Sequence, residues 1–260
     1  MSTRTEQFPR FDLDGRVALV TGAARGLGRS IALALANAGA DVALGFRLRP
    51  SGDQTIDDIR RLGRRAVGLQ MDVLDLAQIQ SAVAEAMAEF GRIDILVNNA
   101  GLGPANPALN ATETDFDLTF AVNVKGTFFV SQTVARSMVA NRYGRIINLS
   151  SQAGFVALPT ESVYCASKAA ISHLTKCLAV EWGEHNITVN AVAPTFIETP
   201  GTEADLADPV FRADVEERIA GLHRIGQAVD VTGAVVFLAS PAASLVTGTT
   251  LLVDGGWTAR

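Results

Sequence analysis

The segment Val17-Ala-Leu-Val-Thr21-Gly22-Ala-Ala-Arg25-Gly26-Leu27-Gly28 decides the fold class of this chain. A short aliphatic run suited to a buried strand leads into a turn with three glycines, and a helical stretch follows. Glycines permit a tight turn and close approach of the backbone to a ligand, while a helix N-terminus offers free N–H groups to a pyrophosphate. The glycine spacing, without Gly-Lys-Ser/Thr, disfavours a kinase or NTPase. The residues expected to bind a nucleotide here are Gly22, Arg25, Gly26, Leu27 and Gly28.

Short aliphatic runs recur along the rest of the chain and alternate with helical stretches. The predicted strands are Val17–Thr21, Val42–Phe46, Ala66–Val73, Ile93–Asn98, Arg145–Ser150, Thr188–Ala193 and Thr249–Asp254. The predicted helices include Gly28–Ala38, Asp75–Phe90, Glu113–Ala140 and Ser162–Glu184. Strands buried on both faces of a parallel sheet have nearly continuous apolar runs, as these do. The alternation predicts an α/β fold, a single Rossmann-like doubly wound parallel sheet with helices on both faces.

Length and composition limit the classes of protein that this chain can be. Its 260 residues would allow two domains, but no linker or repeat divides them. We therefore expect a single dinucleotide-binding domain over residues 1–260, with an N-terminal extension at 1–14. The net charge of -5 disfavours a nucleic-acid partner, and three histidines without a Cys/His cluster disfavour a metal site. Cys165 and Cys177 share one predicted helix, ~18 Å apart by helical rise, so we expect no disulfide.

Two segments bear on the compartment of the protein. The N-terminal extension lacks the apolar centre of a signal peptide, so we expect a cytoplasmic protein. The segment from Val231 to Val253 carries no charge and is long enough to span a bilayer, but Gly233 and Pro241 interrupt it. We therefore expect no membrane partner. The elements predicted in this segment are a helix over about 230–239, a turn at Ser240-Pro241 and a buried strand over about 249–254.

The end of the second predicted strand bears on which dinucleotide binds. Folds that bind NAD place a carboxylate there to hold the ribose hydroxyls. Asp41 precedes the strand and so lies at its wrong end, while Phe46 and Arg47, with Arg49 just beyond, stand at the relevant end. The guanidinium groups of Arg25 and Arg47 suit a 2′-phosphate. We therefore expect NADP(H), and an NAD(H) site flanked by two solvated arginines is the alternative.

The segment Tyr164-Cys165-Ala166-Ser167-Lys168 carries candidate catalytic groups. Residues four apart lie on one face of a helix, so Tyr164 and Lys168 project together. A free tyrosine titrates near ~10, but an adjacent ammonium favours the phenolate, so the pair is a candidate general acid and base. Ser151 directly follows the fifth predicted strand. Since ligands of such sheets bind beyond the carboxyl ends of the strands, we expect these groups to share one cleft.

These motifs, taken in order, resemble the short-chain dehydrogenase/reductase family. The resemblance covers nearly everything from Gly15 to Gly256. It identifies Thr21–Gly28 as the cofactor loop, Asp72 and Val73 as adenine contacts, Asn98–Gly101 as a sheet-stabilising motif and Val253–Gly256 as the usual ending of the last strand. The catalytic residues that it implies are Asn123, Ser151, Tyr164 and Lys168. The further cofactor contacts expected are Phe46, Arg47, Asn99, Ala100, Gly101, Tyr164, Lys168, Pro194, Ile197 and Thr199.

The resemblance implies hydride transfer between a nicotinamide and the carbon of a secondary alcohol or ketone. Tyr164 would exchange a proton with the substrate oxygen, and Ser151 would donate a hydrogen bond to it. Lys168 would lower the tyrosine pKa and bind the ribose, and Asn123 would hold a water that relays protons. Thr195 stands where the family usually has glycine. Because a β-branched residue disfavours positive φ, we expect an altered turn beside the nicotinamide.

The overall pattern looks most like the sugar-acid and polyol dehydrogenases of this family. The 3-oxoacyl-carrier-protein reductases are nearly as similar, and a basic patch at Arg136, Arg142 and Arg145 would suit their acidic partner. A non-catalytic NADP(H) sensor or scaffold is the alternative of another class, although sensors often lose the catalytic set that is intact here. The resemblance places a substrate loop at 195–227. The other predicted pocket residues are Leu102, Gln152, Ala153, Glu161 and Phe196.

The resemblance also implies a homotetramer. Apolar side chains on the two long predicted helices, such as Phe128, Phe129 and Trp182, are candidates for its interfaces. Core packing would explain some of them as well.

Overall fold

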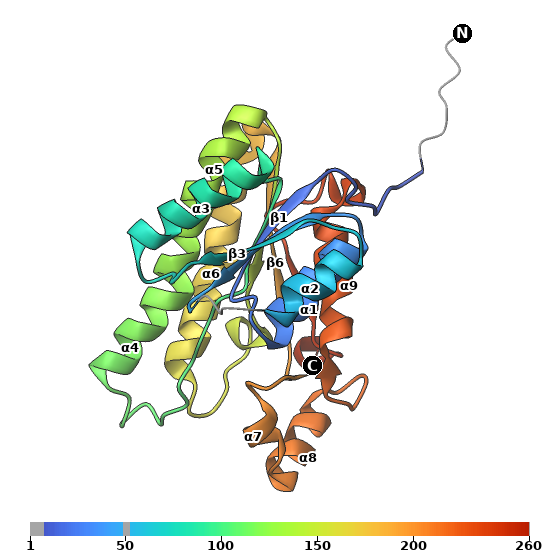
Figure 1. Cartoon of the computed structure of the whole chain (residues 1–260). Helices are drawn as coiled ribbons and strands as arrows, with labels where there is room; N and C mark the ends of the chain where they lie inside the picture. Colours follow the sequence, from blue (N-terminus) through green and yellow to red (C-terminus); the bar gives the residue numbers. More distant parts are fainter. Residues whose placement is uncertain (1–7, 49–52, 260) are drawn as a thin grey trace.

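The computed structural model describes residues 8–48 and 53–259, and its centre is one parallel sheet (Figure 1). Its seven strands follow the order β3-β2-β1-β4-β5-β6-β9. Their bounds are β1 Val17–Thr21, β2 Asp41–Phe46, β3 Ala66–Gln70, β4 Ile95–Asn98, β5 Gly144–Leu149, β6 Ile187–Pro194 and β9 Thr250–Val253. Every neighbouring pair is parallel. The predicted doubly wound α/β fold is therefore confirmed, while Arg49 lies outside the described residues.

Helices cover both faces of the sheet (Figure 1). One face carries α1 (Gly26–Asn37), α2 (Gln54–Arg61) and α9 (Ala228–Ala239), whose apolar residues share a core cluster with β1 and β2. The other carries α3 (Leu76–Phe90), α5 (Thr127–Asn141) and α6 (Ser162–Trp182), which share a second cluster with β4 and β5. The strands are apolar on both sides because both sides are covered. Short 3-10 helices lie between these elements and after β9, at Gln152–Gly154, Gly183–His185, Pro241–Ala243 and Trp257–Ala259.

The helix predicted over 113–140 is interrupted. It consists of α4 (Glu113–Phe120), a π-helical segment at Ala121–Gly126 and then α5. Thr112 and Asp115 start α4 with a reciprocal capping box. At the end of the π-helical segment, a Cβ on Gly126 would lie 3.0 Å from Val73, so glycine permits the close approach of these two segments. The apolar spacing of the sequence does not signal a π-helix, and such segments occur often at functional sites.

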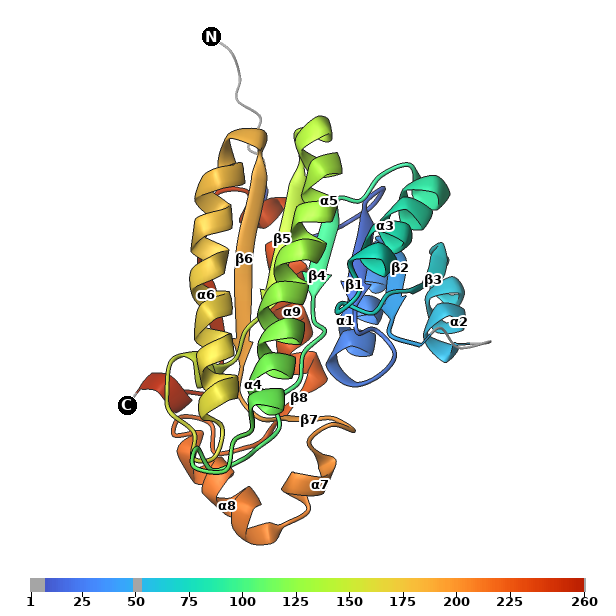
Figure 2. The same cartoon turned by 90° about the vertical axis from the view of Figure 1, so that its left-hand side faces the viewer.

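The order of the strands reverses between β1 and β4, so a crevice opens beyond their carboxyl ends. Figure 2 shows α7 (Glu203–Leu206) and α8 (Pro209–Arg218) below that edge of the sheet. They are joined to it by a two-stranded sheet of β7 (Ile197–Glu198) and β8 (Gly226–Gln227). A third apolar cluster holds this part of the chain together, and it comprises Leu206, Val215, Ile219, Ile225 and Trp257.

The uncharged segment from Val231 to Val253 folds into most of α9, a turn and β9. The prediction that its strand is buried was wrong, because β9 forms an edge of the sheet and Leu251 and Leu252 are each 36% exposed. Across residues 8–48 and 53–259, no helix has both the length and the apolar character needed to cross a bilayer. Cys165 and Cys177 are both free thiols.

Candidate active site

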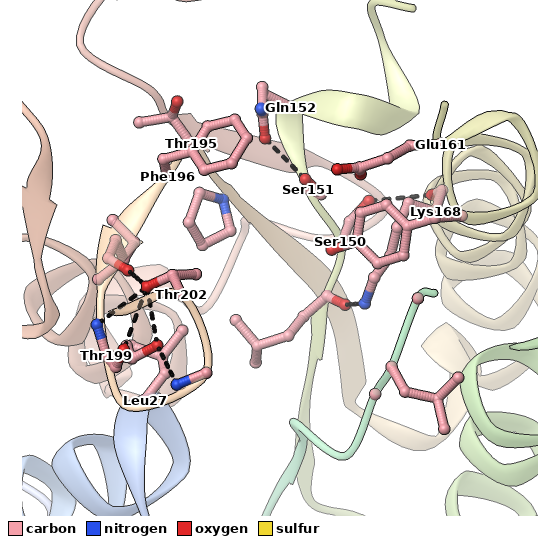
Figure 3. A pocket seen from close by; sticks show the side chains of 18 of the residues that line it. Leu27, Ser150, Ser151, Gln152, Glu161, Lys168, Thr195, Phe196, Thr199 and Thr202 are labelled. Atoms are coloured by element: carbon pink, nitrogen blue, oxygen red, sulfur yellow. Dashed lines mark hydrogen bonds between the residues drawn. The ribbon is translucent and has the colours of Figure 1, made fainter. Parts of the chain in front are cut away.

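A cavity of about 390 Å³ opens at the carboxyl edge of the sheet, and Figure 3 shows the side chains around it. It lies between the residues that follow β4 and β5, the first turns of α6 and the segment after β6. The sequence-predicted residues that line it are Leu27, Asn99, Gly101, Leu102, Ser151, Gln152, Glu161, Tyr164, Lys168, Pro194, Phe196, Ile197 and Thr199. The ends of β4, β5 and β6 therefore meet in one cavity, as the sequence predicts, whereas Gly22 and Asp72 after β1 and β3 do not line it.

Three candidate catalytic residues converge because the turn after β5 packs tightly on α6. A Cβ on Gly154 would lie 2.9 Å from the backbone of Lys168, so glycine lets the two segments touch. The Ser150 hydroxyl donates to the Lys168 carbonyl oxygen at 2.9 Å, which ties the strand end to the helix. The Lys168 ammonium donates to the Leu149 carbonyl oxygen at 2.8 Å and lies 5.5 Å from the centre of the Tyr164 ring. Tyr164 and Lys168 thus face the same side of α6, beside Ser151.

The hydroxyl group of Ser151 is held by two hydrogen bonds. Ser151 donates to the Gln152 side-chain oxygen at 2.7 Å and accepts from the Ala153 backbone N–H at 3.2 Å (Figure 3). A hydrogen bond with Ser151 also acts to lower the pKa of Tyr164. Ser151 is therefore fixed within reach of the phenol, as a preorganised donor requires.

Burial dominates the acid–base properties of the pair. It raises the pKa of Tyr164 to about 12 against the opposing bond from Ser151, and the charge of Glu161 raises it further. Burial also lowers the pKa of Lys168 to about 8. The expectation that the ammonium lowers the tyrosine pKa does not hold in the protein alone, because removal from water disfavours both charged forms. Tyr164 is therefore a protonated phenol at neutral pH, the form that can donate a proton.

The buried lysine should make folding stability depend on pH. Between pH 8 and the unfolded value near ~10.4, the unfolded chain binds more protons at Lys168 than the folded chain does, so this residue makes stability rise with pH. In the wild type, Lys168 should raise the free energy of unfolding by about 2 kcal/mol between pH 8 and 10. We expect Lys168→Met to lack this increase. Urea unfolding at both pH values measures it. The exposed Lys176 of the same helix supplies the control Lys176→Met, and equal slopes for the wild type and Lys168→Met would contradict the prediction.

Asn123 lies in the π-helical segment and is 1% exposed. Its side-chain oxygen accepts from the Leu102 N–H at 2.9 Å, and its amide donates to the Leu102 carbonyl at 2.8 Å and to the Ser167 hydroxyl at 2.9 Å. Its oxygen and the Lys168 ammonium flank Gly101, where a Cβ would lie 3.3 and 3.4 Å from them. The side chain therefore anchors the loop after β4 to α6. This anchoring is a role that the sequence did not reveal.

The glycine loop has the features that a pyrophosphate needs. Gly22 and Gly26 have φ of +64° and +55°, and a Cβ on Gly28 would lie 2.3 Å from the Gly22 carbonyl oxygen, so all three positions require glycine. Arg25 precedes α1 without capping it through its side chain, and the first turn of the helix carries no acidic residue. Its first N–H groups therefore remain available to an anion. The loop fits a dinucleotide phosphate beside the cavity.

The ends of β1 to β3 continue the same edge of the sheet beyond β4. Arg25 and Arg47 are exposed, and neither has an ion pair with a described carboxylate. Asp72 follows β3, and its carboxylate accepts from the Leu74 N–H at 3.0 Å. The structure differs from expectation at Phe46, whose ring is only 1% exposed and packs beside Gly68 in the core. Phe46 can therefore meet a cofactor only through its backbone.

Several predicted cofactor residues do not line the cavity itself. These are Gly22, Arg25, Gly26, Gly28, Phe46, Arg47, Asp72, Val73 and Ala100. The Thr21 hydroxyl accepts from the N–H groups of Asn99 and Ala100, each at 3.0 Å, which joins the glycine loop to the cavity wall. A dinucleotide is long enough to extend from this cavity to the ends of β2 and β3.

Thr195 lines the cavity with a φ outside the positive range, as expected for a β-branched residue. Its N–H donates to the Val253 carbonyl at 3.2 Å, which fixes the turn after β6 against β9. Thr202 and Asp205, which lie in the predicted substrate loop 195–227, also line the cavity, as does Gly103, which the sequence did not indicate. A Cβ on Gly103 would lie 2.4 Å from the Tyr164 ring. Only the fold brings these three residues to the site, because none belongs to a motif.

Comparison with known proteins agrees with this geometry. The model of a family described as enoyl-(acyl carrier protein) reductase matches residues 22–258, which is nearly the whole described chain. The chain belongs to the short-chain dehydrogenase/reductase family. As a short-chain dehydrogenase/reductase it is an oxidoreductase that acts on hydroxyl-bearing carbon.

Its relatives include enzymes of sugar acids and of polyols. It is 42% identical to the 2-dehydro-3-deoxy-D-gluconate 5-dehydrogenase of Escherichia coli, over 96% of this chain and 98% of that one. It is 40% identical to the D-threitol dehydrogenase of Mycolicibacterium smegmatis, over 96% and 95% of the two chains. A solved gluconate 5-dehydrogenase from Burkholderia cenocepacia, in complex with NADP and tartrate, superposes with a TM-score of 0.93 at 39% identity, over 97% and 98% of the two chains.

Proposed function

We propose that this short-chain dehydrogenase/reductase transfers hydride between NADP(H) and a secondary alcohol or ketone of a small sugar acid or polyol. The observation that carries this proposal is the convergence of Ser151, Tyr164 and Lys168 in one cavity beside an uncapped helix N-terminus. The intact set argues against a non-catalytic sensor or scaffold. The relatives named for gluconates and for threitol support the substrate class.

The residues of the site suggest how the proton moves. A bound nicotinamide supplies hydride to a ketone carbon or accepts it from an alcohol carbon. During reduction Tyr164, protonated at neutral pH, donates its proton to the substrate oxygen, and during oxidation the phenolate form of Tyr164 accepts the proton of the substrate hydroxyl. Ser151, whose hydroxyl donates to Gln152 in this structure, would turn to donate to the same oxygen and stabilise its developing charge. Lys168 would hold the cofactor ribose, and Asn123 keeps the surrounding loop in place through its hydrogen bonds to Leu102.

The choice of NADP(H) follows from the charges at the ends of β1 and β2. Arg29 in the first turns of α1 pairs with Asp58, whereas neither Arg25 nor Arg47 pairs with a described carboxylate. Guanidinium groups bind a phosphate with geometrically matched hydrogen bonds. NADP in the related Burkholderia structure supports this choice.

We further propose a single dinucleotide-binding domain in which residues 195–227 close over the substrate, working as a cytoplasmic homotetramer. Exposed apolar side chains lie at two separate places, Leu251 and Leu252 on β9 and Val180 on α6. Subunit interfaces of the tetramer would cover them. Of the interface candidates from the sequence, Phe128, Phe129 and Trp182 pack partly into the core. No basic patch adjoins the cleft at Arg142 and Arg145, because they lie at the opposite end of β5.

A dual-cofactor activity screen tests the proposed function. We expect NADP⁺-dependent oxidation of a polyol or sugar acid to exceed reduction of 3-oxoacyl thioesters, with NADP⁺ preferred to NAD⁺. NADPH binding without turnover across both classes would favour the sensor alternative, and faster reduction of thioesters would favour an acyl reductase.

A further inference from the structure

The wall of the active-site cavity carries an unusual charge pattern. Glu161 and Asp205 both line it, and Lys168 is the only cation among the described residues that do. The Lys168 ammonium is buried against the Leu149 carbonyl and is committed to the cofactor in the proposed mechanism. Figure 3 shows the Glu161 carboxylate among the side chains that line this cavity, together with Ser151. A substrate therefore meets two carboxylates and no available cation.

The negative charge of Glu161 takes part in no helix cap or ion pair with the described residues. Glu161 precedes α6 but makes no side-chain hydrogen bond to cap that helix, and within the described part of the chain no cation forms an ion pair with it. Burial and the charge of Asp205 raise its pKa. Its own charge raises the pKa of Tyr164, which makes the phenolate harder to form. A charged group that is unfavourable for its surroundings and faces a cleft is a candidate for ligand recognition.

A second cavity, of about 510 Å³, extends the same surface toward α8. The two cavities share Leu158, Glu161, Phe196 and Asp205, so the carboxylates stand at their junction. Arg218 lines the second cavity but is neutralised by Asp214 at 2.7 Å. Glu161, Asp205 and Asp208 therefore line the route from the catalytic residues toward α8 without a described cation to neutralise them.

We propose that Glu161, assisted by Asp205, selects an uncharged polyol or its ketose and discriminates against sugar acids. The proposal rests on the proposed function and narrows its substrate class. Carboxylate oxygens accept hydrogen bonds from the hydroxyl groups of a polyol, and such charge-assisted bonds are stronger than neutral ones. A substrate carboxylate at the same place would meet like charge without a compensating cation.

Matched pairs of substrates isolate this effect. Threitol and threonate, xylitol and xylonate, and sorbitol and gluconate differ within each pair only in a terminal CH₂OH or COO⁻ group. We expect the wild-type enzyme at pH 8 with NADP⁺ to oxidise the polyol of the best pair with a kcat/KM at least ~10-fold above that of the acid. Glu161→Gln should reduce this ratio by about 10- to 100-fold, and Asp205→Asn by less because Asp205 is exposed.

The ratio within a pair separates recognition from chemistry. Removing the Glu161 charge also changes the Tyr164 pKa, but that change affects both members of a pair alike and cancels in the ratio. Glu203→Gln is the matched control, since Glu203 is an exposed carboxylate of α7 that lines neither cavity. We expect it to leave the ratio unchanged.

The outcomes also separate this inference from the proposed function. A wild-type preference for the acids, or the same ratio in Glu161→Gln, overturns the inference while the sugar-acid and polyol function stands. If no member of any pair is oxidised and 3-oxoacyl thioesters are reduced, the proposed function is overturned and the inference is lost with it.

Discussion

Tyr164→Phe should lower kcat by about 10²- to 10⁴-fold in both reaction directions, the usual contribution of a positioned acid or base. The substitution removes one hydroxyl and keeps the ring, which packs beside Gly103. The helix and the loop should therefore stay in place, and the dissociation constant of NADPH should change by less than about threefold. Steady-state kinetics and a fluorescence titration with NADPH measure the two quantities.

The chain supplies its own control for this experiment. It contains two tyrosines, and the hydroxyl of the other, Tyr143, is buried without a hydrogen-bond partner just before β5, at the far end of the sheet. Tyr143→Phe makes the same chemical change and should leave kcat within about twofold. Near-normal turnover by Tyr164→Phe would remove the tyrosine from the proposed mechanism.

Replacing both Arg25 and Arg47 by glutamine should reduce kcat/KM with NADP⁺ by about 100-fold, since each charge-assisted bond contributes about 1.5–3 kcal/mol. The value with NAD⁺, which lacks the 2′-phosphate, should change by less than about threefold. The structure also restricts how cofactor preference can be altered. Phe46 is a core residue, so an aspartate there would bury a charge and destabilise the fold.

The control for this variant is Arg136→Gln. It removes the charge of an exposed side chain on α5, which does not lie at the ends of β1 and β2. It should leave kcat/KM unchanged with both NADP⁺ and NAD⁺. An equal decrease in kcat/KM with NADP⁺ and NAD⁺ in the double variant would mean that the arginines bind a part that both dinucleotides share, rather than the 2′-phosphate. A wild-type preference for NAD⁺ would refute the phosphate pocket outright.

The fold could be predicted from the sequence because its signals are local. Continuous apolar runs mark β1 and β5, and the glycine turn marks the start of α1. The predictions failed where the deciding contact is distant in the chain. The π-helical segment before α5 has no signature of its own, and the apolar residues of β9 do not reveal that this strand forms an edge.

The candidate site was predictable to a similar degree. The motif residues Ser151, Tyr164 and Lys168 meet as expected, because strand ends and a helical repeat determine their places. Their pKa values were not predictable from spacing, because burial outweighs the attraction between ammonium and phenolate. Asp205 was predicted only as part of the substrate loop 195–227, because no motif marks this residue individually.

The small apolar cluster beneath α7 and α8 has a consequence for dynamics. Its five buried residues, from Leu206 to Trp257, are separate from the two clusters that hold the sheet and its helices. Units with few apolar contacts open at a fraction of the free energy of global unfolding. The segment over the cleft can therefore exchange its amide hydrogens and admit a ligand while β4, β5 and α6 stay protected. Substitutions in this cluster can then change the rate of ligand exchange without altering the geometry of proton transfer.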